Sequence, residues 1–333
     1  EEYVVLGDEQ TGEWLGSHVS GRCRIERIET PPAPPPQRGS IRRTVGRLVA
    51  PLVARGATAP LLCRALLPPV RRSDGALERL RPDVVHFTTQ DAFLTPVPSI
   101  FHPHDLQHLH LPHLFPRQER CFRDRNYRAF CQQAAMVAVV STWTREDVLA
   151  HYRLAPDKVH VVPFAPVTQA YAAPTDADAA AFVAARGLPD RFVFYPAQTW
   201  PHKNHAALLE ALARLKAERR LVVPLVSSGH LNEHHAALAT RARALGVAEH
   251  VHFLGFVTPA ELQCLYRRSA AVVIPSLFEA ASFPLWEAFL AGVPAACSNV
   301  TSLPAQAGDA ARGPGSGGAA TIHGRLRALI PDG

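Results

Sequence analysis

Short apolar segments rich in β-branched residues alternate with helix-patterned segments along most of the chain. Such runs are typical of strands buried on both faces of a parallel sheet. Consecutive parallel strands need right-handed helical crossovers between them, so the alternation predicts an α/β fold. We expect strands at residues 83–87, 99–103, 136–141, 159–164, 191–196, 221–229, 250–255 and 271–275.

The helical segments divide these strands into two Rossmann-like halves. We predict helices at residues 117–133, 142–151, 205–218 and 233–245, and further ones starting near Pro259 and Pro284. A length of 333 residues with 47% apolar residues suits two domains with cores of their own. The prediction is an N-terminal Rossmann-like domain at 1–164, an Ala-, Pro- and Asp-rich interdomain linker at 165–189, and a C-terminal Rossmann-like domain at 190–333.

Composition restricts the class of protein. No run reaches membrane-spanning length and no signal peptide is recognisable, so we expect a cytoplasmic protein. The six cysteines lack paired metal-ligand spacing and indicate reduced, mostly buried thiols. The formal charge of +6 favours anionic partners, but the aromatic and basic pattern of RNA-binding proteins is missing. We therefore predict no nucleic-acid partner.

The amino-terminal region is the least regular part of the sequence. The chain starts at Glu1 and its only methionine is Met136, which led us to expect an incomplete amino end. Residues 30–40 contain PPAPPP and indicate an extended connection. Residues 41–81 are basic and apolar, which fits a membrane-surface patch or, our preferred interpretation, helices with a solvated arginine face.

Residues 276–294, SLFEAASFPLWEAFLAGVP, contain the strongest functional pattern. They follow a predicted strand, and Pro284 and Gly292 suit the first turn and the end of a short helix. A helix start at the carboxyl edge of a sheet offers free backbone N–H groups to a diphosphate. Glu279 in the loop and Glu287 in the first helical turn are suited to binding sugar hydroxyls beside it. The pattern predicts a nucleotide-sugar site.

The segment EAASFPLWE resembles the E-G-F-G-x-P-x-x-E motif of the retaining glycosyltransferases of family 4, also termed group 1. That resemblance implies two Rossmann-like domains facing across a cleft, the GT-B fold. It also implies that Glu287 binds the ribose and Glu279 the transferred sugar. The loop and helix start at Ala281, Ser282 and Phe283 would contact the donor. Ala280 and Ser282 replace the motif's glycines, which would restrict the loop if either position needed a positive φ.

A second segment of the resemblance, YPAQTWPHKNHAALLEAL, follows a predicted strand. Lys203 there matches the phosphate-binding lysine, whereas Gln198 and His202 occupy positions where many relatives have arginine. We expect His202 beside a diphosphate to have a raised pKa and to make the site pH-dependent. The same donor site would include Ser228 and Gly229 after one strand and Val257 after the next.

The histidine-rich segment HPHDLQHLHLPH contains the candidate site residues of the N-terminal Rossmann-like domain. The resemblance implies that His104 acts near the transferred sugar or the acceptor, with Asp105 as its orienter or a proton acceptor. The five histidines between 102 and 113 also fit a metal site, with His104 and His108 one helical turn apart, or no function at all. We prefer the family role and predict no metal and no cofactor. Asp176 and Asp178 form a D-x-D that we interpret as solvated linker.

The combined interpretation is a metal-independent retaining hexosyltransferase of the mannose or glucose type. Its partners would be a nucleotide-diphosphate sugar and a sugar or lipid-linked hydroxyl acceptor in glycan or glycolipid synthesis, with peripheral contact at the inner face of the membrane. His104, Asp105, Lys203 and Glu279 are the candidate catalytic residues. Two alternatives stay open, an inactive nucleotide-sugar-binding protein and a glycoside hydrolase using Glu279 and Glu287. Residues beyond Asp309 depart from the family pattern.

Overall fold

A computed structural model describes residues 3–7, 21–27, 68–166, 173–310, 319, 322–324 and 326. The chain divides into two compact units, residues 1–66 and 67–333. In the first unit, β1 (Tyr3–Gly7) pairs in parallel with β2 (Cys23–Arg27). The proline-rich segment 30–40 and most of the basic region 41–81 lie outside the described residues. No helix in the described ranges is long and apolar enough to cross a membrane.

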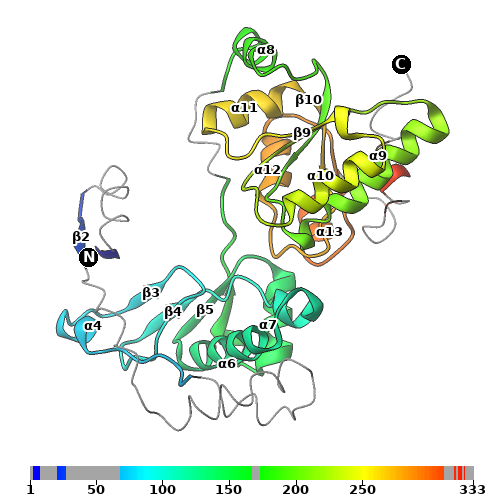
Figure 1. Cartoon of the computed structure of the whole chain (residues 1–333). Coiled ribbons are helices and arrows are strands. Elements are labelled where there is room, and N and C mark those ends of the chain that lie inside the picture. Colours follow the sequence, from blue (N-terminus) through cyan, green and yellow to red (C-terminus); the bar gives the residue numbers. More distant parts are fainter. Residues whose placement is uncertain are drawn as a thin grey trace, which may run out of the picture. The chain divides into compact units, whose positions relative to one another are not determined.

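The second unit starts with a four-stranded parallel sheet (Figure 1). Its strand order is β3 (Val85–Phe87), β4 (Ser99–Phe101), β5 (Met136–Val139) and β6 (Val159–Val161). The connections contain α4 (Ala76–Arg79), α5 (Gln107–His110), α6 (Arg117–Gln133) and α7 (Thr142–Tyr152), with short 3-10 turns at Pro112–Leu114 and Pro156–Lys158. The side chain of Ser141 caps α7 by accepting a hydrogen bond from the Thr144 N–H.

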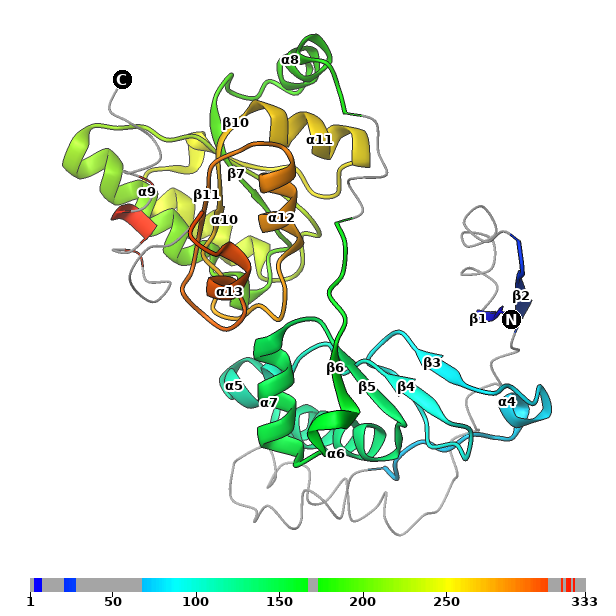
Figure 2. The same cartoon turned by 180° about the vertical axis from the view of Figure 1, so that it is seen from behind.

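A second parallel sheet of five strands follows (Figure 2). Its strands are β7 (Phe192–Pro196), β8 (Leu225–Ser228), β9 (Val251–Phe253), β10 (Ser269–Ile274) and β11 (Ala295–Cys297), in the spatial order β11-β10-β7-β8-β9. The helices are α8 (Asp176–Ala185), α9 (His205–Arg219), α10 (His235–Ala244), α11 (Pro259–Arg268), α12 (Phe283–Leu290) and α13 (Leu303–Ala307), with 3-10 turns at Pro201–Lys203 and Ala248–His250.

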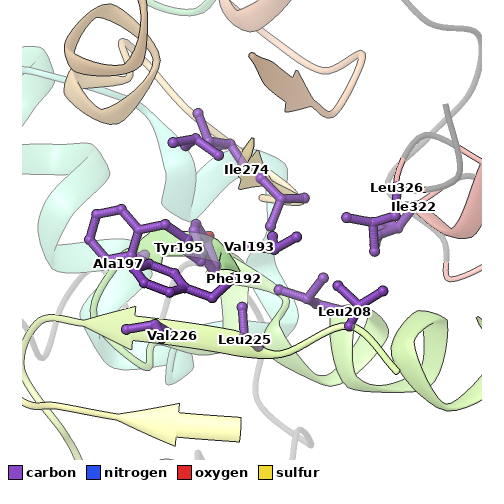
Figure 3. Close-up of a cluster of buried hydrophobic side chains, with 14 of the residues drawn as sticks. Phe192, Val193, Tyr195, Ala197, Leu208, Leu225, Val226, Ile274, Ile322 and Leu326 are labelled. Carbon is purple, nitrogen blue, oxygen red and sulfur yellow. The ribbon is translucent and has the colours of Figure 1, made fainter. Parts of the chain in front are cut away.

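The second core forms around β7, whose residues Phe192, Val193, Phe194 and Tyr195 are all buried. Leu208 from α9 and Leu225 from β8 pack in the same cluster (Figure 3). Ile322 and Leu326 are also buried in it, so part of the divergent carboxyl-terminal sequence contributes to this core. The continuous apolar runs of the sequence therefore correspond to strands covered on both faces.

The predicted alternation of strands and helices agrees with the observed elements, although most strands are shorter than expected. Residues 165–189, predicted as a linker, contain α8, which packs against α11. A capping box between Thr175 and Asp178 starts this helix. Asp176 and Asp178 of the D-x-D lie in its first turn, and Asp176 accepts a hydrogen bond from Arg267 Nε at 2.6 Å. Asp176 and Asp178 thus belong to the exposed first turn of α8.

Candidate functional site

The order of the second sheet determines where a ligand can bind. From β7, the chain adds β8 and β9 on one side and then β10 and β11 on the other. Ligands of open α/β sheets bind beyond the carboxyl ends of the strands at such a reversal. The turn Pro201–Lys203 follows β7, and the loop containing Glu279 follows β10. The two predicted segments therefore meet at the switch point.

Lys203 and Glu279 are in direct contact there. Lys203 Nζ lies 2.6 Å from Glu279 Oε1, and Ser276 Oγ donates a 2.6 Å hydrogen bond to the same oxygen. The hydroxyl of Tyr195 lies 3.1 Å from Ser276 Oγ and donates to the Lys203 carbonyl at 2.8 Å. Only 8% of the Glu279 side chain is exposed, against 22% for Lys203. This network orients the ammonium group and supplies the buried carboxylate with a cation.

The backbone of Glu279 is also held by its neighbours. Its carbonyl accepts hydrogen bonds from Thr301 Oγ1 at 2.6 Å and Ser302 Oγ at 2.8 Å, and its N–H donates to Thr301 Oγ1 at 3.0 Å. On the other side, the Leu277 N–H donates to the His202 carbonyl at 2.8 Å. The loop after β10 is thereby joined to the turn after β7 and to the segment that precedes α13.

The lost motif glycines do not strain this loop. Neither Ala280 nor Ser282 has a positive φ, and Ser282 lies at −116°. Gln306 instead holds Ser282 through both backbone groups, accepting from its N–H at 2.9 Å and donating to its carbonyl. Ser282 Oγ is buried at the start of α12 and has no partner in the described part of the chain. A hydroxyl beside free helix N–H groups can donate to an anion.

Glu287 lies deeper in α12 than we predicted. The helix starts at Phe283, so Glu287 falls in the second turn rather than the first. Its side chain is buried against α11, where the Tyr266 hydroxyl donates a 2.6 Å hydrogen bond to Glu287 Oε2. Burial raises the pKa of Glu287, and the hydrogen bond from Tyr266 opposes that rise. One oxygen of the Glu287 carboxylate therefore already accepts a hydrogen bond within the protein.

His202 carries no charge at neutral pH in the protein alone. Burial and, to a smaller extent, the neighbouring Lys203 charge lower the pKa of His202 to about 3. The raised pKa that we expected would therefore require a bound diphosphate to outweigh burial. His205, in the first turn of α9, is shifted in the same direction as His202, since burial lowers the pKa of its imidazole to about 3. Lys203 is the basic side chain of this segment that forms an ion pair.

Ser228, Gly229 and Val257 lie at the neighbouring strand ends. Ser228 is the buried last residue of β8, and Val257 is partly buried beyond β9. Gly229 has φ 127°, and a Cβ there would come within 2.8 Å of backbone atoms of residues 197 and 198. Its N–H donates to the Gly255 carbonyl at 2.8 Å. The backbone around Gly229 is therefore packed more closely than any other residue type allows.

His104 and Asp105 follow β4 in the first sheet. His104 has a left-handed φ of 60°, and its Nε2 lies 3.0 Å from the Thr88 carbonyl oxygen. Asp105 Oδ1 accepts from the Gln107 N–H at 2.9 Å. Burial raises the pKa of Asp105, and the negative charge of Glu279 adds a smaller upward contribution.

Phe164 connects this segment with the start of α12. Its ring lies 5.9 Å from that of His104 and stacks on Phe283 at 6.0 Å with an interplanar angle of 8°. The Phe164 ring therefore contacts both His104 and the first residue of α12, the helix that carries Glu287.

The metal alternative at His104 and His108 has no geometric support. His108 is fully buried, neither ring nitrogen has a partner in the described residues, and burial lowers its pKa to about 4. Its ring packs edge-on against Tyr127 at 5.5 Å. Within the described ranges, one group of side chains has metal-ligand geometry, and it contains neither of these histidines.

Sequence reasoning missed the residues that hold the site together. Tyr195 and Ser276 link Lys203 to Glu279, Thr301 and Ser302 hold the loop backbone, and Tyr266 pairs with Glu287. Tyr195 and Ser276 stand at the carboxyl ends of two predicted strands, which was a usable signal. The other three belong to segments that had no predicted role.

Comparison with known proteins agrees with this geometry. The family model described as "Glycosyl transferases group 1" matches residues 176–314, and the model "Glycosyltransferase Family 4" matches residues 26–165. The chain belongs to the family 4, group 1 glycosyltransferases. The resemblance of the EAASFPLWE segment is thereby confirmed at the level of the family.

Curated proteins are similar to this chain in sequence. The chain is 26% identical to the O-antigen chain mannosyltransferase B of Escherichia coli over 208 residues, which cover 62% of this chain and 54% of that protein. It therefore spans about half the length of that relative.

Two solved structures show the GT-B fold. The Anabaena protein HepE, in complex with UDP and glucose, has TM-score 0.69 and 18% identity, covering 99% of this chain and 82% of that one. Sucrose-phosphate synthase of Thermosynechococcus elongatus has TM-score 0.66 and 16% identity, covering 99% and 90%. The predicted fold class is confirmed.

Proposed function

We propose that this glycosyltransferase transfers a mannose- or glucose-type hexose from a nucleotide-diphosphate sugar to a hydroxyl acceptor with retention of anomeric configuration. The observation that carries the proposal is the Lys203–Glu279 pair, buried at the switch point beside the start of α12. Lys203 pairs with the loop that leads into α12, so a cation and a helix N-terminus would both be available to a departing diphosphate. The names of the curated relatives, which include several mannosyltransferases, support a hexose donor.

Lys203 and the start of α12 would stabilise the leaving phosphate. The buried Ser282 hydroxyl would add a hydrogen bond to the same group, since it has no other partner in the described residues. These donors are in place before the ligand binds, so little reorganisation accompanies the reaction. On this arrangement no metal ion or cofactor is needed to neutralise the diphosphate.

Glu279 and Glu287 would orient the donor rather than attack it. Glu279 Oε1 already accepts from Lys203 and Ser276, which weakens it as a nucleophile and leaves the carboxylate suited to binding sugar hydroxyls. Glu287, next to Tyr266, would hold the ribose. The acceptor oxygen would bond to the anomeric carbon on the face from which the diphosphate leaves, as the bond to the phosphate oxygen breaks. The acceptor proton would pass to that phosphate oxygen, and no side chain would form a covalent intermediate.

His104 and Asp105 would serve the acceptor side. A raised Asp105 pKa and its electrostatic link to Glu279 support a role close to the transferred sugar. The acceptor would be a sugar or lipid-linked hydroxyl, and the reaction would take place in the cytoplasm at the inner face of the membrane. The basic sequence at residues 41–81 would supply that contact under the membrane-surface interpretation of this segment, the alternative to a solvated arginine face.

A donor panel tests the proposal. The purified chain is titrated with GDP-mannose, UDP-glucose and ADP-glucose by thermal shift, and release of nucleoside diphosphate is followed with and without EDTA. We expect one donor to bind saturably and to be turned over in EDTA, with an α-linked product. Binding without turnover would instead identify an inactive binding protein, and sugar release from an aryl glycoside would identify a hydrolase.

The substitution Glu287→Ala tests whether Glu287 contributes to donor binding. It should weaken donor binding while the fold, followed by circular dichroism, stays intact. The matched control is Glu233→Ala, a carboxylate that precedes α10 on the same half of the chain. Equal donor affinity in the Glu287 variant and the wild type would remove Glu287 from the site.

A further inference from the structure

Three side chains outside the donor site converge on one point between α5 and α7. Asp147 and His151 are four residues apart on α7 and therefore lie on the same face of that helix. His110 is the last residue of α5. His110 Nε2 lies 2.8 Å and His151 Nδ1 3.0 Å from Asp147 Oδ1, and the three ligand atoms all lie within 4.8 Å of one another.

The carboxylate at the centre of this cluster is buried and incompletely satisfied. The Asp147 side chain is 5% exposed, and its Oδ2 has no hydrogen-bond partner in the described part of the chain. A buried oxygen atom without a partner costs free energy. A cation bound to the carboxylate would lower that cost. The histidines provide access to it, because their side chains are 32% and 40% exposed.

We propose that His110, Asp147 and His151 bind a divalent transition-metal ion of the Zn²⁺ class. Two imidazole nitrogens and one carboxylate oxygen suit zinc and its neighbours, whereas Mg²⁺ and Ca²⁺ require sets of oxygen ligands. Solvent on the exposed side of the two histidines supplies the fourth ligand. A tetrahedral site then forms from side chains of two helices.

The spacings of the two histidine nitrogens to the carboxylate oxygen are already close to those of a zinc site. Tetrahedral ligands at zinc bond lengths are separated by about 3.3 Å. The present spacings to Asp147 Oδ1, 2.8 and 3.0 Å, differ from that by a few tenths of an ångström. His110 exchanges its hydrogen bond to the carboxylate for a bond to the ion. His151 gives up the 2.9 Å hydrogen bond of its Nδ1 to the Asp147 backbone carbonyl, and each imidazole moves its N–H to the opposite ring nitrogen.

The ion would tie α5 to α7 and fix the His110 ring. That ring lies 5.2 Å from Trp143 and 5.5 Å from Phe278, the residue immediately before Glu279. These aromatic groups cover part of the site and limit the orientations of the imidazole. The ligands include neither Lys203 nor Glu279, so the ion has a structural role and the diphosphate site stays metal-free.

Zinc titration of the EDTA-stripped chain tests the proposal. Zinc chloride is added to the untagged protein and binding is followed by calorimetry, with Co²⁺ absorption as a spectroscopic test of tetrahedral geometry. We expect one site per chain, no competition by Mg²⁺, and an increase in melting temperature on saturation. His110→Gln and His151→Gln should each lower the affinity about tenfold or more.

His113→Gln is the matched control, because the chain has 17 histidines and His113 is an exposed neighbour of α5 outside the cluster. It should leave zinc affinity unchanged. The proposal is overturned if wild-type protein binds no zinc, or if the His110 and His151 variants bind it as tightly as His113→Gln. Asp147→Asn adds a third comparison, and the two exposed histidine variants keep the test decisive should that buried substitution fail to fold.

Discussion

Replacing Lys203 by methionine removes the only positive charge that the described contacts bring to the Glu279 carboxylate. Losing one partner of a fully buried ion pair costs about 3–5 kcal/mol, whereas an exposed pair contributes about 0–1 kcal/mol. Glu279 is 8% and Lys203 22% exposed, so this pair lies between those limits. Ser276 still donates to Glu279 Oε1 in the variant. We expect a loss of about 2 kcal/mol in the free energy of unfolding.

A double-mutant cycle separates the ion pair from other effects of the substitution. For a chain of this size, a loss of about 2 kcal/mol lowers the melting temperature by roughly 3 °C. Glu279→Gln removes the buried charge, so Lys203→Met/Glu279→Gln should recover about half of the lost stability or more. Lys216→Met on α9 is the control, since Lys216 donates to the Gly246 carbonyl and has no carboxylate partner among the residues that the structure describes.

Activity and stability should respond differently in this cycle. The double variant regains stability but lacks the cation proposed to stabilise the leaving phosphate, so its turnover should stay as low as that of Lys203→Met. Thermal and urea denaturation supply the free energies, and release of nucleoside diphosphate supplies the rates. Additive effects of the two substitutions, or a loss below about 0.5 kcal/mol in Lys203→Met, would refute the coupling.

Three further substitutions test other parts of the site. Burial raises the folded-state pKa of Glu287 above 4.5, so the free energy of unfolding of the wild type should fall as pH rises from 4.5 through that raised pKa. Glu287→Gln should remove this pH dependence in urea titrations across the same range. Gly229→Ala places a Cβ against residues 197–198 at φ 127° and should cost about 2–4 kcal/mol by chemical denaturation; a neutral result would contradict the packing. Thr301→Val removes two hydrogen bonds to the Glu279 backbone and should cost about 1–2 kcal/mol, with weaker donor binding by thermal shift; unchanged binding would show that the loop holds its position without them.

The elements that sequence predicted well have strong local signals. The amphipathic helix at 117–133 agrees with α6 in both bounds, and the apolar run at 271–275 overlaps β10. The helix start near Pro284 was also correct to one residue, because proline fixes its own backbone there. Periodicity and helix caps are local properties, so they can be recognised without knowledge of the tertiary structure.

The elements that were missed depend on contacts between distant segments. Helix α8 did carry local signals, the capping box of Thr175 and Asp178 and an alanine-rich run, which the linker prediction overlooked; its place against α11, more than 70 residues later in the chain, is the part that depends on a distant contact. The position of Tyr266 beside Glu287 likewise results from the packing of α11 against α12. The cluster of His110, Asp147 and His151 joins two helices separated by the whole of α6 and β5. No spacing rule for a single segment could have identified these groups.

The substituted motif loop shows why the family pattern can change without loss of geometry. Glycine is needed only where a positive φ or a close backbone approach excludes a Cβ, and neither condition applies at Ala280 or Ser282. Hydrogen bonds from Thr301, Ser302 and Gln306 hold the loop instead. Those three residues precede or lie in α13, so the position of Glu279 depends on that helix. Substitutions that loosen α13 should therefore weaken donor binding even though α13 carries none of the proposed donor ligands.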